Sequence, residues 1–266
     1  MRVRVMGIVN VTPDSFSDGG RFLSTTAALD HAMRLIGEGA DVLDVGGEST
    51  RPGAEPVGQA QEIDRVAPLI EAIRARWDGA ISVDTMKPAV ARAAVAAGAT
   101  MWNDVTALGH APDSAATAAM LGCEVVLMHM KGQPRTMQDD PRYDDVVGEV
   151  RDHLASRAEA AMAEGVARDR IWLDPGIGFG KTLAHNLALT ARLDALAGLG
   201  FPVLYAASRK RTIQAIDATA TDAGDRLGGS VALALAGARR GARMVRVHDV
   251  RETVQALKVQ AAIDAA

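Results

Sequence analysis

VRVMGIVN, residues 3–10, is a continuous apolar run that ends in a polar amide, and ADVLDVGGEST, residues 40–50, repeats this pattern. Between them, TTAALDHAMRLIGEG, residues 25–39, has apolar side chains at three- to four-residue spacing and two glycines at its end. Such spacing predicts an amphipathic helix that stops before residue 40. Because continuous apolar runs are typical of strands buried on both faces, these residues predict a strand–helix–strand unit with parallel strands.

The same alternation continues through the rest of the 266 residues. Further apolar runs lie at 80–85, 100–105, 123–130, 170–176, 202–210 and 243–249, with segments of helical periodicity at 61–77, 87–97, 112–121, 145–165, 185–197, 225–240 and 250–264. Eight such units favour an α/β fold in which the strands close into a (β/α)8 TIM barrel, which commonly takes about 250 residues. No composition shift or long linker divides the chain, so we expect one domain over residues 1–266. The alternative is an open doubly wound sheet, which usually binds its ligand at one switch point.

Nearly every strand-like run ends in a carboxylate, amide, hydroxyl or cationic side chain. The C-terminal ends of the strands form one face of a TIM barrel, so these side chains are expected to gather at a common rim. We therefore expect the active site at the C-terminal ends of the strands.

Composition excludes several classes of function. Hydrophobic residues make up 48% of the chain, the net charge is only -4, and basic residues are scattered among acidic ones. This pattern argues against a nucleic-acid-binding surface. The single cysteine, Cys123, lies in an apolar run, which favours a reducing compartment without disulfides. With no long apolar segment or signal peptide before the first strand, we expect no membrane association and a cytoplasmic location.

Two signals that look like nucleotide-binding motifs fail on spacing. In GIGFGKT, residues 176–182, Pro175 stands where a Walker phosphate loop requires glycine. Lys181 stands where a dinucleotide-binding fingerprint requires its third glycine. The histidines form no HExxH pair and have no cysteine partner, so zinc has little support.

The informative segments are polar loops that follow the strand-like runs. They read NVTPDSFSDGG (10–20), ESTRPG (48–53), DPGIGFGK (174–181), ASRK (207–210) and VRVHDV (245–250). Together and in this order, they resemble the dihydropteroate synthases, a folate-biosynthesis family of pterin-binding barrels, from Val5 to about Ala262. The resemblance implies a transferase that joins a dihydropterin carrying a CH2-diphosphate to p-aminobenzoate and releases pyrophosphate. It also implies sulfonamides as potential competitive inhibitors.

The resemblance assigns a pterin site to three strand ends. Asp174 matches the carboxylate that binds the ring, with Asn103 as its amide partner and Asp84 as a third ring-facing group. A buried carboxylate can accept two parallel hydrogen bonds from guanidine-like N–H groups. Each residue could instead cap a following turn, but three of them on separate strands favour a pocket. Lys210 matches the lysine at the pterin edge.

The resemblance also implies a p-aminobenzoate site. Ser208 precedes a helix expected to begin at Arg209, and a helix N-terminus attracts an anion such as the p-aminobenzoate carboxylate. The remaining implied contacts are ring walls from Phe179 and Pro52 and loop contacts from Thr50 and Arg51.

The last strand predicts an anion site for the diphosphate. Arg246 and His248 alternate along it, so both side chains face the same side, which in a barrel can be the lumen. Mg2+ prefers oxygen ligands and bridges substrate phosphates. By resemblance, Asn10 is a metal ligand and Asp18 a second, loop-borne one.

The implied mechanism is dissociative. Arg246 and His248, with Mg2+, neutralise the departing diphosphate, while Asp84 stabilises the cationic carbon of the pterin. Lys210 completes the set of expected catalytic residues. The resemblance further implies a homodimer formed through outer helices late in the chain.

Three alternatives remain at this point. A methyltetrahydrofolate-dependent corrinoid methyltransferase would share the pterin pocket but would not need STRPG or SRK. A non-catalytic pterin-binding paralogue would lose the loop arginine and threonine or the metal-binding asparagine. An unrelated barrel that acts on sugar phosphates would explain the anion site but not the inward carboxylates and amide.

Overall fold

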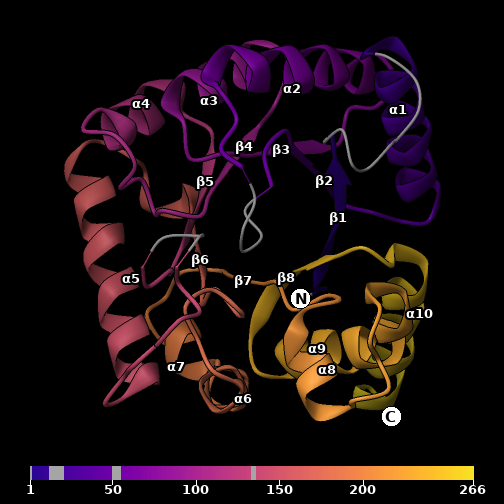
Figure 1. Ribbon diagram of the computed structural model, residues 1–266, viewed down its shortest axis with the longest axis vertical. Coiled ribbons are helices and arrows are strands. Elements are labelled where there is room, and N and C mark those ends of the chain that lie inside the picture. The colour runs from indigo at the N-terminus through magenta and orange to yellow at the C-terminus, as the bar shows by residue number, and fades with distance from the viewer. Residues whose placement is uncertain (1, 12–20, 50–54, 133–135) are drawn as a thin grey trace.

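Eight parallel strands close into a barrel in chain order in the computed structural model, which describes residues 2–11, 21–49, 55–132 and 136–266. The strands are β1 (Arg4–Asn10), β2 (Val42–Gly46), β3 (Ala80–Asp84), β4 (Met101–Asp104), β5 (Glu124–Met128), β6 (Ile171–Asp174), β7 (Val203–Tyr205) and β8 (Ala242–Val247). Helices surround the strands as an outer ring (Figure 1). The predicted (β/α)8 TIM barrel is confirmed.

A helix follows each strand in the described residues. These are α1 (Arg21–Gly37), α2 (Gln59–Arg74), α3 (Pro88–Ala96), α4 (Ser114–Leu121), α5 (Val146–Ala163), α6 (Leu183–Ala191), α7 (Asp194–Ala197), α8 (Arg211–Ile216), α9 (Leu227–Arg239) and α10 (Val250–Asp264), with short 3-10 turns η2 (Arg168–Arg170) and η3 (Ala223–Arg226). The helix predicted at 185–197 is instead two helices, α6 and α7. The sequence also missed α8 as a separate short helix before α9.

Side chains alternate between the barrel interior and the helical layer. The interior cluster comprises one buried residue from most strands: Met6, Val42, Met101, Val126, Trp172, Leu204 and Met244. Their neighbours along the strands, such as Leu43 and Val125, pack outward against the helices in a larger cluster. Each fully buried large apolar side chain contributes roughly 1.5–3 kcal/mol. The barrel is therefore a filled core on which the polar strand ends rest.

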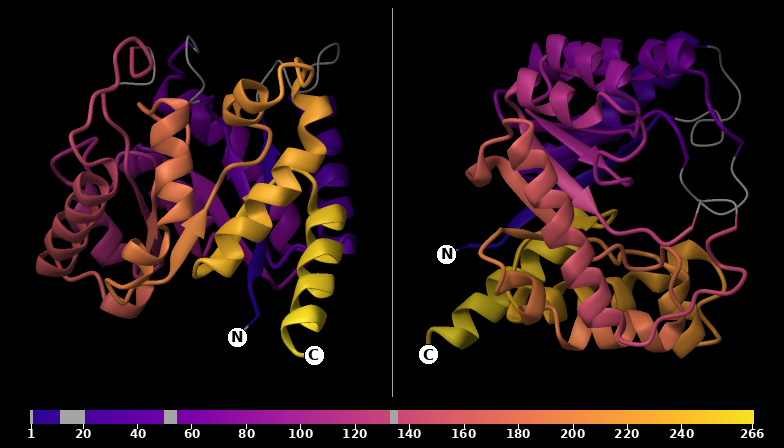
Figure 2. Two further views of the ribbon diagram at one scale, coloured as in Figure 1. Left: turned by 90° about the horizontal axis from the view of Figure 1, so that it is seen from below. Right: turned by 90° about the vertical axis from the view of Figure 1, so that its left-hand side faces the viewer.

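Arg4 covers the interior at the N-terminal end of the strands. Its guanidinium lies 5.6 Å from the ring centroid of Trp172 and 3.8 Å from the Glu124 carboxylate. Both chain termini lie at this same end (Figure 2). The opposite end is left to the loops that follow the strands.

Strand register brings the polar strand ends together. Asn10 pairs with Gly46, Gly46 with Asp84, and Asp84 with Asn103. Four adjacent strands thus end at one level, as the sequence predicts for the active-site rim. Among the described residues, none of the helices is long and apolar enough to cross a membrane.

Candidate active site

A partly buried arginine lies between two carboxylates at the centre of the rim. Arg246 of β8 donates from Nε to Asp44 Oδ2 at 2.5 Å and from Nη2 to Asp84 Oδ2 at 2.7 Å. The inward direction predicted for Arg246 is correct, because Met244 two residues earlier belongs to the interior cluster. This contact joins β8 to β2 and β3 across the barrel mouth.

Asp44 is the residue of this group that the sequence analysis missed. It is fully buried, and its Oδ2 also accepts a hydrogen bond of 3.2 Å from Asn103 Nδ2. Asp44 lies within an apolar run rather than at its end, so a rule that considers only polar residues at strand ends does not identify it. Its spacing of two residues from the inward Val42 was the signal that could have identified it.

Two carboxylate oxygens of this group lack partners. Among the described residues, Asp44 Oδ1 and Asp84 Oδ1 are buried and have no hydrogen-bond partner. An unsatisfied buried acceptor costs roughly 1–3 kcal/mol, so the site is poised to accept N–H or O–H donors. Chemically, the arrangement is a cation flanked by acceptors that a ligand can satisfy.

The charges of this group shift one another's protonation. Burial raises the pKa of Asp84 to about 7, against the lowering effect of Arg246 and with a further rise from Asp44. Burial opposes the charge of Arg246, yet the Asp44 and Asp84 carboxylates raise its pKa above the ordinary value. Arg246 therefore stays cationic, while Asp84 can exchange a proton near neutral pH.

Asp174 and Lys210 influence each other electrostatically. Asp174 is buried at the end of β6, and its Oδ1 accepts a hydrogen bond of 2.7 Å from the Gly176 backbone N–H. Burial raises its pKa, and the charge of Lys210 partly counters that rise. Burial lowers the pKa of Lys210 to about 8, partly offset by Asp174.

Lys210 also contacts the loop that follows β6. Its Nζ donates to the Ile177 carbonyl oxygen and lies 4.7 Å from the ring centroid of Phe179. The structure thus brings Phe179, Lys210 and Asp174 into one neighbourhood. The assignments of Asp174 and Lys210 to the pterin site and of Phe179 to the p-aminobenzoate site stay predictions.

Ser208 and His248 meet at the ends of β7 and β8. Ser208 Oγ lies 3.0 Å from His248 Nδ1 and accepts a hydrogen bond of 3.2 Å from the His248 backbone N–H. The expectation that Ser208 precedes a helix beginning at Arg209 is wrong. The helix α8 begins at Arg211, and Arg209 has a left-handed φ of 56°. Ser208 is therefore held by His248 rather than at a helix N-terminus.

The conformation of Arg209 is fixed by contacts of its side chain and of its backbone N–H. Its side chain turns to Asp249, donating from Nε at 3.0 Å and from Nη2 at 2.5 Å. A left-handed φ at a non-glycine residue costs about 1–3 kcal/mol and is found where surrounding contacts enforce it. Here the Asp249 pair and a hydrogen bond of 2.9 Å from the Arg209 N–H to Ser230 Oγ enforce it.

Asn10, the predicted metal ligand, ends β1 with its amide oxygen near Asp84. An ideal Cβ at Gly46 would lie 3.7 Å from Asn10 Oδ1 and 3.9 Å from Asp84 Oδ2, so the amide and the carboxylate line the same point. Within the described ranges, no group of three or more histidine, cysteine or acidic residues could hold a metal by itself. The predicted site residues Asp18, Thr50, Arg51 and Pro52 lie outside the described residues.

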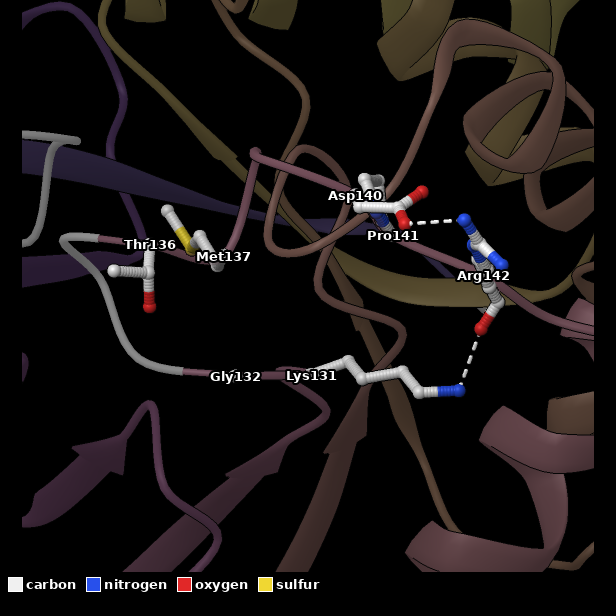
Figure 3. A pocket seen from close by; sticks show the side chains of 7 residues that line it. All are labelled: Lys131, Gly132, Thr136, Met137, Asp140, Pro141 and Arg142. Atoms are coloured by element: carbon white, nitrogen blue, oxygen red, sulfur yellow. Dashed lines mark hydrogen bonds and ion pairs between the residues drawn. The ribbon is translucent and has the colours of Figure 1, made fainter.

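A cavity of about 220 Å³ lies in the segment that follows β5. Figure 3 shows its lining, with Arg142 paired to Asp140 at 2.7 Å and Lys131 Nζ donating to the Arg142 carbonyl at 2.6 Å. None of its lining residues is among the predicted site residues. The charged groups at the strand ends, rather than this cavity, identify the candidate active site.

Known proteins resemble this chain over nearly its whole length. The model of a family described as pterin binding enzyme matches residues 6–248. Dihydropteroate synthase of Escherichia coli K12 is 47% identical over 255 residues, 96% of this chain and 89% of that protein. The structure of Xanthomonas albilineans dihydropteroate synthase with 4-aminobenzoic acid has a TM-score of 0.94 at 52% identity, covering 100% of this chain and 94% of that one. Yersinia pestis dihydropteroate synthase in a sulfonamide drug complex has a TM-score of 0.94 at 45% identity, covering 100% and 95%.

Proposed function

Because the chain belongs to the family of pterin-binding enzymes, we propose that its barrel mouth carries out dihydropteroate synthesis with the residues described above. The chain is a transferase of folate biosynthesis. It condenses (7,8-dihydropterin-6-yl)methyl diphosphate with p-aminobenzoate to give 7,8-dihydropteroate and pyrophosphate. Synthase relatives at this identity favour this reaction over a corrinoid methyltransferase or a non-catalytic paralogue.

The buried Asp44–Arg246–Asp84 group is the observation that carries this proposal. A pterin ring presents several N–H donors, and the unpartnered carboxylate oxygens of Asp44 and Asp84 are acceptors of the matching type. Asp174 supplies a further buried carboxylate, and Asn103, held by Asp44, supplies an amide. A bound pterin would therefore remove the cost of leaving these acceptors unpaired.

Arg246 and His248 are proposed to bind the diphosphate. Arginine has five N–H donors in a fixed plane, and two of them point to Asp44 and Asp84. The others can donate to phosphate oxygens without loss of the carboxylate contacts. Positive charge at this position stabilises the charge that develops on the leaving group.

Asn10 and Asp18 are proposed to hold Mg2+, which would supply further positive charge to the diphosphate oxygens. The oxygen of Asn10 beside Asp84 fits such an ion, because Mg2+ takes few protein ligands and keeps several waters. Calorimetric titration of the diphosphate substrate with and without Mg2+ tests this assignment. Equal affinity in both titrations would contradict it.

The reaction itself needs little proton chemistry from the protein. The amine nitrogen of p-aminobenzoate forms a bond to the CH2 carbon, the bond from that carbon to the diphosphate oxygen breaks, and the amine loses one proton. Asp84 in its ionised form stabilises positive charge on the pterin as the diphosphate departs. Phe179 would position the second substrate beside that carbon, and Lys210, at the pterin edge, would lie at the junction of the two substrates.

Sulfonamides and a homodimer follow as further proposals. A sulfonamide resembles p-aminobenzoate in shape and charge, so it is expected to compete at the same site. Ile216, Leu227, Val259 and Ile263 are exposed on α8, α9 and α10, which supports association of two copies through these outer helices. Light scattering at several concentrations tests the dimer, and a monomer mass throughout would contradict it.

The experiment that tests the function is a direct product assay. The protein is incubated with the dihydropterin diphosphate, p-aminobenzoate and Mg2+, and both pyrophosphate and dihydropteroate are quantified. Equal amounts of the two products are expected, with none when p-aminobenzoate is omitted. Absence of dihydropteroate with either Mg2+ or Mn2+ would overturn the proposal.

A further inference from the structure

We propose that Lys181 is a positioning residue for the p-aminobenzoate end of the active site, because it fixes the loop that presents Phe179 and the Ile177 carbonyl to Lys210. The proposal rests on the function proposed above. Within the described residues, the hydrogen bonds of Lys181 do not include Asp44, Asp84 or Arg246. It acts through residues 176–180, named here the glycine loop, which joins β6 to α6.

The side chain of Lys181 is buried and fully engaged. It is only 3% exposed, and its Nζ lies 3.0 Å from the Gly176 carbonyl oxygen, 3.0 Å from that of Phe179 and 3.2 Å from that of His129. His129 Nδ1 is a fourth neighbour at 2.9 Å. An ammonium group has three N–H donors, so these acceptors use its whole capacity. A lysine this deeply buried needs such partners, and here they are backbone oxygens rather than a carboxylate.

The contacts of Lys181 join the glycine loop to the end of β5. Gly176 and Gly180 have φ values of 66° and 62°. A Cβ at these positions would lie 1.9 Å from the His129 carbonyl oxygen and 2.3 Å from that of Lys131. The loop backbone therefore lies directly on the 129–131 backbone, and Lys181 binds both segments at once.

Every carbonyl oxygen of the glycine loop accepts a side-chain hydrogen bond. Lys181 Nζ donates to the carbonyl oxygens of Gly176 and Phe179, and Lys210 Nζ donates to that of Ile177. Gln138 Nε2 donates to the Gly178 carbonyl oxygen at 2.5 Å, and Tyr143 Oη donates to that of Gly180 at 2.8 Å. Lys181 thus holds two of these oxygens and is the one donor in this set that also bonds the β5 end. Its removal would release the loop at both sides of Ile177.

His129 supports this arrangement as a neutral acceptor. Its ring packs edge-on against His153 at 4.9 Å between centroids. Burial, followed by the charge of Lys181, lowers the pKa of His129 to about 2. The ring is therefore neutral, and in the tautomer that carries its proton on Nε2 its Nδ1 accepts from Lys181. Burial lowers the pKa of Lys181 to about 7; the charge of Asp174 partly offsets this, and the charge of Lys210 adds to it.

The geometry connects this anchor to the second substrate. The Phe179 carbonyl oxygen accepts a hydrogen bond from Lys181, while the Phe179 ring lies 4.7 Å from Lys210 Nζ. Lys210 in turn is held by the Ile177 carbonyl. When the loop shifts, the ring and the ammonium group lose their relative position, whereas Asp84, Asn103 and Arg246 keep theirs.

The test compares Lys181→Met with the wild type in the product assay. Methionine keeps the apolar stem but removes every donor. The KM for p-aminobenzoate is expected to rise about tenfold, the effect of losing one positioning contact, while the KM for the dihydropterin diphosphate changes by less than about twofold. Lys258→Met is the matched control, because Lys258 is exposed on α10, and it should leave both constants unchanged.

A second variant keeps the test decisive if Lys181→Met does not fold. Gln138 is exposed and holds only the Gly178 carbonyl, so Gln138→Ala should fold and raise the KM for p-aminobenzoate selectively but less. If the KM values of both substrates change equally, or only the melting temperature changes, the positioning proposal is overturned while the synthase function stands. A wild type that forms no product would instead overturn the function.

Discussion

Arg246 determines the electrostatics of the site because it is a partly buried cation between two carboxylates, of which Asp44 is fully buried. Removing the arginine from such a group typically costs about 3–5 kcal/mol, since two carboxylates are left uncompensated, whereas loss of the Asp84 charge leaves Arg246 paired with Asp44. The two carboxylates raise the pKa of Arg246, and Asp44 also raises that of Asp84. A substrate with a negatively charged group for Arg246 and N–H donors for Asp44 Oδ1 and Asp84 Oδ1 would match both the cation and these acceptors.

The pH dependence of the enzyme should follow from Asp84. Its pKa is raised to about 7, so it is protonated below that pH and ionised above it. Because the ionised form stabilises the pterin cation, kcat/KM should fall as pH decreases below about 7. Asp44→Asn removes a like charge, so it should move this acid limb to lower pH. A pH profile of kcat/KM for both proteins checks this, and an unmoved limb would contradict the assignment.

At the scale of elements, parity along the strands explains most of what the sequence could predict. Asp84 and Asp174 are the last residues of β3 and β6, and Asn103 is the last but one of β4, so their direction and level follow from a period of two. Asp44 follows the same parity but is enclosed by apolar residues, and strand ends alone do not identify it. The division of residues 185–197 into α6 and α7 depends on packing around Leu193 and Leu196, which are fully buried. The spacing of the apolar residues does not show where α6 ends and α7 begins.

The glycine loop is an element whose shape permits no side chain at Gly176 or Gly180. Gly176→Ala places a methyl group on the His129 carbonyl oxygen at a left-handed φ. The free energy of unfolding should fall by about 2 kcal/mol or more. Gly37→Ala is the control, because nothing lies within 4 Å of its added Cβ. Urea denaturation measures both, and equal stability of the two variants would exclude close packing at Gly176.

At the scale of the whole molecule, the barrel separates stability from chemistry. Its interior is apolar and is covered at one end by Arg4, while the charged groups gather at the other. The fold class could be predicted because eight strand–helix repeats are typical of a (β/α)8 barrel. The contacts between loops, such as those of Lys181 with His129, join residues far apart in sequence. No local sequence pattern predicts these contacts.

Trp172 fills the interior beside Arg4 and should affect stability more than turnover. Trp172→Ala removes a large buried side chain and leaves a cavity, so the free energy of unfolding should fall by about 3–5 kcal/mol. The kcat should stay within about threefold of the wild type, because the strand ends keep their register. Denaturation and steady-state turnover on the same preparation test this. A large loss of turnover with unchanged stability would contradict the separation.

The most direct test of the central claim is the turnover of Asp84→Asn in dihydropteroate formation. This variant keeps the shape of the side chain but removes its charge beside Arg246. The kcat should fall about 100-fold with a melting temperature close to that of the wild type. Asp78→Asn, an exposed residue just before β3, should match the wild type in both. Wild-type turnover in Asp84→Asn would contradict the assignment of this barrel mouth as the catalytic site.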